Sequence, residues 1–171
     1  MNLTEYVKES RRTFTKLETV EMDMFHLESG VTSEYGEIID ILKRNVAYQK
    51  EIDINHLKEE IGDYFWYVAN LIHLDEQIKE SDIEEIFTMW NMYQNSISTE
   101  TLGKPFYEVI PTLNEQNNLT VVLYLVKLFD LDLEEIFHLN IKKLKVRFPD
   151  GFTTEKALTR DLEKEDKILN K

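Results

Sequence analysis

Apolar residues recur at the three- and four-residue spacing of an α-helix through most of this chain, and this periodicity most constrains its fold. Near the N-terminus, for example, Tyr6, Val7 and Phe14 fall on one helical side. Only 5 glycines and 3 prolines interrupt the 171 residues, so long loops are not expected. The sequence therefore predicts an all-α fold, a helical bundle that forms one domain over residues 1–171.

Capping residues and breakers divide the first half of the pattern into three predicted helices. The first is expected over residues 4–27 and ends at Gly30, because glycine often terminates a helix. The second is expected from Thr32 or Ser33 to residue 48. A short polar turn follows, and a third helix, capped by Asp53 or Asn55, continues to about residue 74.

The second half is predicted from similar signals. Ser81-x-x-Glu84 is a capping-box pattern that predicts a helix over residues 81–96. Residues 119–129 are typical of a short buried helix, and Asp132-x-x-Glu135 caps a last helix that ends near Arg147. Two segments remain without a defined place, namely an inserted helical segment over residues 75–118 and a charged tail over residues 153–171.

The composition excludes several classes of function. The absence of cysteine excludes disulfides, thiolate zinc sites and cysteine nucleophiles. A net charge of −13 argues against broad binding to nucleic acids or anionic membranes. No apolar run is long enough to span a bilayer, and no secretory signal pattern is visible. We therefore expect a cytoplasmic protein with neither a nucleic-acid nor a membrane partner.

Two acidic motifs of the form Glu-x-Gly-acid lie on adjacent predicted helices, at residues 34–37 and 60–63. Residues three apart on a helix point to the same side, and the short turn between the helices brings both motifs to nearly the same height. Carboxylates this close repel one another unless a cation neutralises them, and an all-oxygen ligand set suits Mg²⁺, with Mn²⁺ as the alternative. The predicted ligands are Glu34, Glu37, Glu60 and Asp63.

The opposing interpretation of these motifs is two solvated acidic faces. The repeated pattern, the matched glycines and the apolar flanks favour the metal site. Gly36 and Gly62 have no side chain, so another backbone, a water molecule or a phosphate can approach closely there. Iron is disfavoured because neither motif has the Glu-x-x-His pattern of di-iron bundles.

Two further groups of residues follow from helical spacing. Trp66, Tyr67 and Asn70 continue the side of the helix that carries Asp63, where the rings can stack on a base and the amide can bind its edge. The alternative for both aromatic residues is a place in the core or an interface. On the last helix, Asn140, Lys143 and Arg147 share one face and suit phosphate capture, although cations also accumulate at helix C-termini for dipole reasons.

Several segments of the sequence resemble one family. The acidic motifs, the segment HLKEEIGDYFWYVANL, the ending NIKKLKVRFPDGF and the opening TEYVKESRRT are similar to the all-α MazG-like nucleoside triphosphate pyrophosphohydrolases, relatives of the dimeric dUTPases. The resemblance covers residues 5–74 and 119–160 and leaves residues 75–118 unmatched. Ser33 replaces a common glycine and Phe148 a common tyrosine, and neither position is a predicted ligand.

The resemblance implies an enzyme that splits a nucleoside triphosphate between its α and β phosphates, giving the monophosphate and pyrophosphate. It implies that the four carboxylates hold Mg²⁺, that Lys43, Lys143 and Arg147 contact phosphates, and that the chain forms a homodimer or homotetramer. A water oriented by the site would attack phosphorus, with one carboxylate as general base. The alternative is a non-catalytic helical regulatory protein that binds a nucleotide or a metal.

Overall fold

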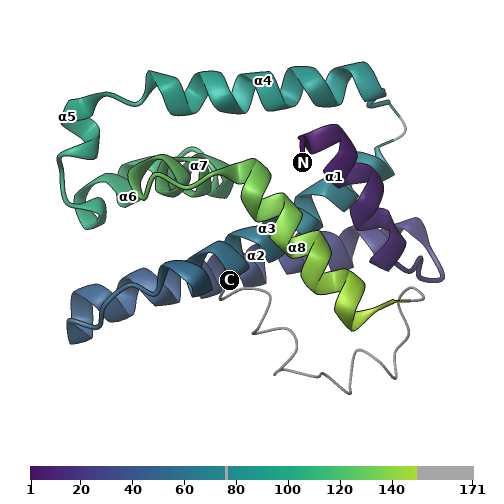
Figure 1. Ribbon diagram of the computed structural model, residues 1–171, viewed down its shortest axis with the longest axis horizontal. Coiled ribbons are helices and arrows are strands. Elements are labelled where there is room, and N and C mark those ends of the chain that lie inside the picture. The colour runs from purple at the N-terminus through teal and green to yellow at the C-terminus, as the bar shows by residue number, and fades with distance from the viewer. Residues whose placement is uncertain (76, 150–171) are drawn as a thin grey trace.

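The structure is a computed structural model of the chain that describes residues 1–75 and 77–149 (Figure 1). Within these residues it contains eight α-helices, one short 3₁₀ turn and no β-strand, so the all-α prediction is confirmed. The predicted charged tail at residues 153–171 lies outside the described residues. No helix in the described ranges is both long and apolar enough to cross a bilayer.

Two long helices carry the acidic motifs. Helix α2 spans Val20–Tyr48 and α3 spans Ile54–Leu74, and a short connection turns the chain between them. Gln49 adopts a left-handed conformation after α2. The Asp53 carboxylate caps α3 by accepting hydrogen bonds from the backbone N–H groups of Asn55 and His56, at 3.0 and 3.2 Å. The two helices are packed neighbours, as the sequence predicts.

The prediction of one helix over residues 4–27 is wrong. The chain forms a short helix α1 over Leu3–Ser10, a 3₁₀ turn η1 over Arg11–Thr13, and then an extended link before α2. A hydrogen bond across the link holds this change of direction, because the buried Asp23 carboxylate accepts the backbone N–H of Leu17 at 2.8 Å. The Thr19 hydroxyl also caps the new helix at the N–H of Met22.

The predicted helix end at Gly30 is also wrong, since α2 runs through this residue without a break. A Cβ atom added to Gly30 would lie 2.1 Å from a ring carbon of Tyr67 on α3. Gly30 therefore allows close packing of α2 against α3 and does not terminate a helix.

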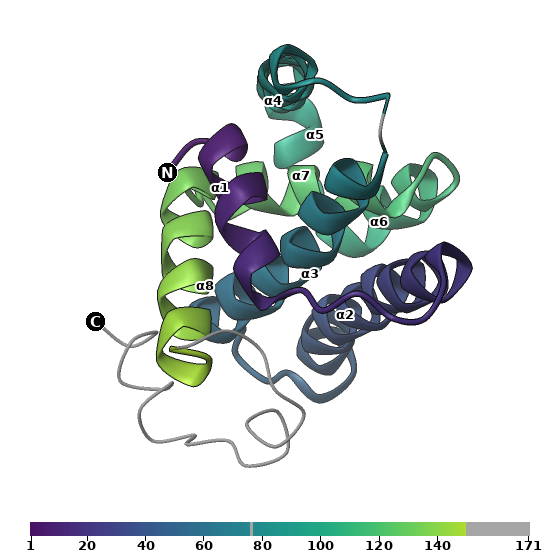
Figure 2. The same ribbon diagram turned by 90° about the vertical axis from the view of Figure 1, so that its right-hand side faces the viewer.

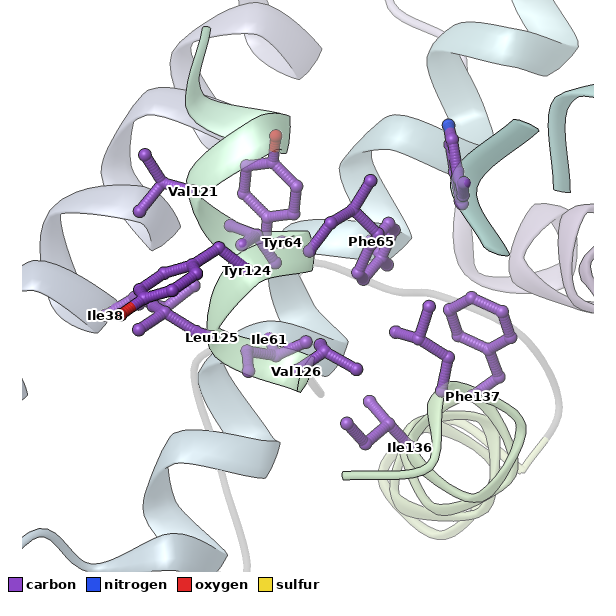
Figure 3. Close-up of a cluster of buried hydrophobic side chains, with 14 of the residues drawn as sticks. Ile38, Ile61, Tyr64, Phe65, Val121, Tyr124, Leu125, Val126, Ile136 and Phe137 are labelled. Atoms are coloured by element: carbon purple, nitrogen blue, oxygen red, sulfur yellow. The ribbon is translucent and has the colours of Figure 1, made fainter. Parts of the chain in front are cut away.

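The core forms where α3 meets two later helices. Helix α7 spans Asn118–Leu128 and α8 spans Leu133–Arg147, both close to their predicted bounds. Asp132 caps α8, as the sequence predicts, by accepting the backbone N–H of Glu134 at 2.9 Å. Figure 3 shows side chains from α2, α3, α7 and α8 converging on one apolar cluster that includes Ile38, Ile61, Phe65, Tyr124, Leu125 and Phe137.

The inserted segment forms three helices, α4 over Glu80–Ser96, α5 over Thr99–Leu102 and α6 over Phe106–Asn114. Figure 1 shows α4 along the outer edge of the molecule, and it packs against α1 and α7. The predicted capping box at Ser81 is wrong in register, because the Asp82 carboxylate instead accepts the backbone N–H of Lys79 at 2.9 Å. The α4 side chains Ile83 and Trp90 are buried in the core.

Candidate functional site

Three of the four predicted metal ligands meet between α2 and α3. Glu34 lies on α2, whereas Glu60 and Asp63 lie one turn apart on α3. One carboxylate oxygen from each of the three lies within 4.8 Å of the others, and all three side chains are half-buried. The spacing argument from the sequence therefore placed both helices in the correct relative register.

This cluster carries more negative charge than its surroundings neutralise. Burial raises the pKa of Glu34 to about 8, and the negative charges of Asp63 and Glu60 contribute to the same shift. Burial, followed by the charge of Asp63, also raises the pKa of Glu60. Without a further cation, the arrangement favours a protonated carboxyl group at neutral pH.

Glu37, the fourth predicted ligand, lies outside this group of three. It occupies the next turn of α2 after Glu34, and its side chain is exposed. A Cβ atom added to the neighbouring Gly36 would have no other atom within 4 Å. The cluster is therefore open to solvent on the Glu37 side, and the role of Glu37 remains a prediction.

Helix α8 supplies a cation and an amide to the cluster. Figure 2 shows α3 between α2 and α8, and the Lys143 ammonium on α8 lies 2.7 and 2.6 Å from the two Asp63 carboxylate oxygens. Lys143 also donates to Glu59 at 3.2 Å. Burial alone would lower the pKa of Lys143, but Asp63 and Glu59 raise it, and the net shift is upward. The amide nitrogen of Asn140 donates to Asp63 at 2.7 Å.

The other two predicted phosphate contacts, Arg147 and Lys43, lie on different helices. Arg147 ends α8, with its guanidinium 5.1 Å from the centre of the Phe148 ring. Burial raises the pKa of Tyr67 on α3, and the Arg147 charge opposes that shift. Lys43 lies nine residues beyond Glu34, or about 14 Å along the axis of α2. Its exposed ammonium pairs with Asp40, so the structure does not bring Lys43 to the carboxylates.

The three predicted base contacts differ from one another. The indole nitrogen of Trp66 donates to the Thr13 hydroxyl at 2.9 Å and to the Ser10 carbonyl at 3.2 Å, so this residue joins α3 to the first two elements. Asn70 is buried, and its amide nitrogen donates to the Trp66 carbonyl. Trp66 and Asn70 therefore make structural contacts. For Trp66 this agrees with the alternative interpretation, a place in the core or an interface. Tyr67 instead lines a cavity.

Tyr67, one helical turn after Asp63 on α3, lines an open cavity of about 660 Å³. The pKa of Tyr67 is raised by burial and then by the charges of Glu34 and Asp63. The edge of the Tyr67 ring meets the His26 ring with centroids 5.8 Å apart. The remaining wall is mostly apolar and comes from the start of α2 and the link before it, through Leu17, Glu21, Met22, Phe25, Ser29, Gly30 and Ser33.

Sequence reasoning missed the α2 side of this cavity and also Glu59. The predicted first helix ran through residues 17–27, so their side chains had no place next to Tyr67. The available signal was local, because Met22 and Phe25 are apolar residues close to the first acidic motif. Glu59 directly precedes Glu60, and its contact with Lys143 joins residues 84 positions apart in the chain.

The donor set of the cluster fits a hard divalent cation. All candidate ligands are carboxylate oxygens, which Mg²⁺ and Mn²⁺ prefer. Burial, and then the neighbouring negative charges, raise the pKa of Glu34 and of Glu60, and a bound divalent cation would stabilise their ionised forms. Bound there, such an ion would neutralise phosphate charge and make phosphorus more electrophilic.

Comparison with known proteins supports this interpretation. Residues 25–93 match the family model described as MazG nucleotide pyrophosphohydrolase domain. The matched region contains the acidic cluster, Tyr67 and most of α4, and it ends before α8. No curated protein and no solved structure matches the chain. By this match and by its paired acidic motifs, the region of residues 25–93 is MazG-like, of the all-α nucleoside triphosphate pyrophosphohydrolase type.

Proposed function

We propose that this protein hydrolyses a nucleoside triphosphate between the α and β phosphates in a reaction that depends on Mg²⁺. The single observation that carries the proposal is that the cavity residues Gly30 and Tyr67 each lie one helical turn from a carboxylate of the cluster, Glu34 on α2 and Asp63 on α3. A metal site and an apolar, aromatic cavity at this spacing suit the two ends of a nucleotide, its phosphates and its base.

Each end of the nucleotide has residues that suit it. Arg147 at the end of α8 offers a planar group that can bind two phosphate oxygens at once. Lys143 offers a point charge, already located at the Asp63 carboxylate. On the other side, the Tyr67 and His26 rings provide flat surfaces on which a base can stack.

The reaction itself needs one water and one base. The water oxygen forms a bond to phosphorus, the bridging oxygen leaves with pyrophosphate, and a carboxylate takes the proton of the water. A carboxylate of the site that is ionised in the presence of the metal suits the role of base, because it can accept the proton of a water molecule within hydrogen-bond reach. We propose that the enzyme acts on the nucleotide pool of the cytoplasm.

One observation favours the non-catalytic alternative. Lys143 already contacts both oxygens of Asp63, so this carboxylate is paired in the structure. A chain in which this pair is permanent would bind nucleotides or a metal without turnover. The two functions differ in whether pyrophosphate is released.

The deciding experiment measures pyrophosphate release from a panel of canonical and modified nucleoside triphosphates, with Mg²⁺ and with EDTA. We expect release with Mg²⁺ from at least one substrate, no release in EDTA, and a loss of at least about 100-fold for alanine at Glu34, Glu60 or Asp63. Alanine at Glu37 tests whether this exposed carboxylate joins the site in the active protein. Binding of a nucleotide without any pyrophosphate would establish the regulatory alternative, and full activity in EDTA would refute the metal site.

A further inference from the structure

A buried chain of hydrogen bonds leads from α1 to the acidic cluster. The Tyr6 hydroxyl lies 2.8 Å from the side-chain oxygen of Asn140, and the Asn140 amide nitrogen lies 2.7 Å from Asp63. Tyr6 is fully buried, and its ring stacks on Phe137 with centroids 4.3 Å apart. These hydrogen bonds therefore join three helices, α1, α8 and α3, through the amide group of Asn140.

The ionised Asp63 carboxylate determines which groups donate and which accept in this series of hydrogen bonds. An ionised carboxylate only accepts hydrogen bonds, so Asn140 must turn its NH₂ group toward Asp63 and its oxygen toward Tyr6. The Tyr6 hydroxyl then donates to that oxygen. A flipped amide would place its oxygen against the Asp63 carboxylate with no proton between them. Burial and the charge of Asp63 raise the pKa of Tyr6 well above its ordinary value, so the hydroxyl keeps its proton at neutral pH.

The glycine of the second acidic motif belongs to the same arrangement. A Cβ atom added to Gly62 would lie 3.1 Å from the Cβ of Asn140 and 3.2 Å from its amide nitrogen. The Gly62 carbonyl also lies 3.0 Å from the Tyr6 hydroxyl. Gly62 thus leaves the space that Asn140 occupies, whereas Gly36 in the first motif faces open space.

Asp63 is held by two groups of different charge, Lys143 and Asn140. A divalent cation on the same carboxylate would repel the Lys143 ammonium, but it would leave the neutral amide in place. The Asn140 contact is therefore the one compatible with a loaded metal site. Residues that orient a metal ligand in this way typically affect metal affinity.

We propose that Tyr6 is a positioning residue for the metal site: by donating to Asn140, it holds the amide in the orientation that directs Asp63 toward the cation. Gly62 serves the same purpose by leaving room for Asn140. This inference rests on the proposed function, since it assumes that the carboxylates bind a divalent cation.

The first test compares Mn²⁺ binding to the wild type and to Tyr6→Phe, by calorimetry and by electron paramagnetic resonance. Tyr6→Phe keeps the ring on Phe137 and removes only the hydroxyl. Removal of a direct outer-shell partner costs about 10–100-fold in metal affinity, and Tyr6 lies one bond further out, so we expect a loss of about three- to tenfold. Tyr124→Phe is the matched control, because its buried hydroxyl has no hydrogen-bond partner within the described residues.

A double-mutant cycle tests whether Tyr6 acts through Asn140. In an Asn140→Ala background, Tyr6→Phe should cause no further loss of Mn²⁺ affinity. The same loss in both backgrounds would overturn the proposal, and so would unchanged affinity in the single variant. Gly62→Ala provides a second route to the same amide, with Gly36→Ala as its matched control. We expect weaker Mn²⁺ binding for Gly62→Ala and wild-type affinity for Gly36→Ala.

A metal-free measurement separates this inference from the proposed function. The side-chain NH₂ signal of Asn140, observed by NMR without metal, should shift in Tyr6→Phe and stay unchanged in Tyr124→Phe. An unchanged signal in Tyr6→Phe would show that the hydroxyl does not orient the amide. A wild type that binds no Mn²⁺ would overturn both proposals, whereas tight wild-type binding with no effect of Tyr6→Phe would overturn only the positioning role.

Discussion

Lys143 on α8 lies within 2.7 Å of both carboxylate oxygens of Asp63 on α3, although 80 residues separate the two in the chain. Only 1% of the Lys143 side chain is exposed, so its ammonium is held away from water, whereas 28% of the Asp63 side chain is exposed. Removing the lysine would leave Asp63 and Glu59 beside Glu34 and Glu60 without that cation.

Lys143→Met should therefore destabilise the metal-free protein. Loss of one partner of a buried ion pair costs about 3 kcal/mol, and we expect a decrease of about that size in the free energy of unfolding, measured by urea titration at neutral pH. Added Mg²⁺ should restore part of it. Lys58→Met is the matched control, because Lys58 pairs with the more exposed Glu135 and should cost at most about 1 kcal/mol.

The raised pKa of Glu34 predicts how stability depends on pH. Between about pH 4.5 and 8 the folded state keeps a proton on Glu34 that the unfolded state releases. The folded state then binds more protons, so the free energy of unfolding of the metal-free protein should fall as the pH rises through this range. Glu34→Gln should flatten the dependence. A wild-type profile that rises from pH 4.5 to 8 would contradict the assignment.

The same carboxyl group should couple metal binding to proton release. At pH 7 the metal-free site holds a proton that a divalent cation must displace, so Mg²⁺ affinity should increase from pH 6 to 8. Calorimetry in two buffers with different ionisation enthalpies measures the number of protons released. We expect a value near one for the wild type and near zero for Glu34→Gln, should that variant still bind the ion.

Adjacent aromatic residues on α3 should give different mutational phenotypes. Tyr67 lines the cavity, so Tyr67→Ala should raise KM or change the preferred base more than it lowers kcat. Trp66 is hydrogen-bonded to Thr13 and Ser10, so Trp66→Ala should mainly lower the melting temperature. Steady-state kinetics and thermal unfolding of both variants check this assignment. A purely thermal effect in both would place Tyr67 in the core, outside the binding site.

Exposed apolar residues on α4 indicate a contact between copies of the chain. Met89 and Met92 are 54% and 66% exposed on a helix whose opposite side is packed in the core. We expect a homo-oligomer in which this face of α4 is covered, and Met89→Glu combined with Met92→Glu should shift the mass measured by light scattering toward the monomer. A monodisperse wild-type monomer at micromolar concentration would contradict this.

Local signals predicted the helices that carry most of the site. Asp53 and Asp132 cap α3 and α8 at the expected positions, because an N-cap depends on residues within one turn. Helical spacing likewise placed Glu34 opposite Glu60 and Asp63. It also put Asn140 and Lys143 on one face, and both side chains do reach Asp63.

The remaining features depend on particular side-chain contacts, which the spacing of apolar residues alone does not reveal. Leu17 and Val20 continue the apolar pattern of the N-terminal segment, yet both are exposed after the chain reverses. The contact that fixes this reversal joins Leu17 to Asp23, and no periodic signal marks it. Similarly, the basic stripe on α8 was compatible with phosphate binding or with a helix end, and only the folded chain shows Lys143 paired with a carboxylate.

The contact between Gly30 and Tyr67 limits how this protein can be adapted to a new substrate. The Tyr67 ring occupies the space that any side chain at position 30 would need, so this one contact sets both a wall of the cavity and the distance between α2 and α3. Those helices also carry Glu34 and Asp63, one turn from the contact. A larger residue at position 30 would therefore alter base selection and ligand spacing together. Substitutions at Met22 or Phe25, on the outer part of the wall, offer a route to new base preferences that leaves the carboxylates in register.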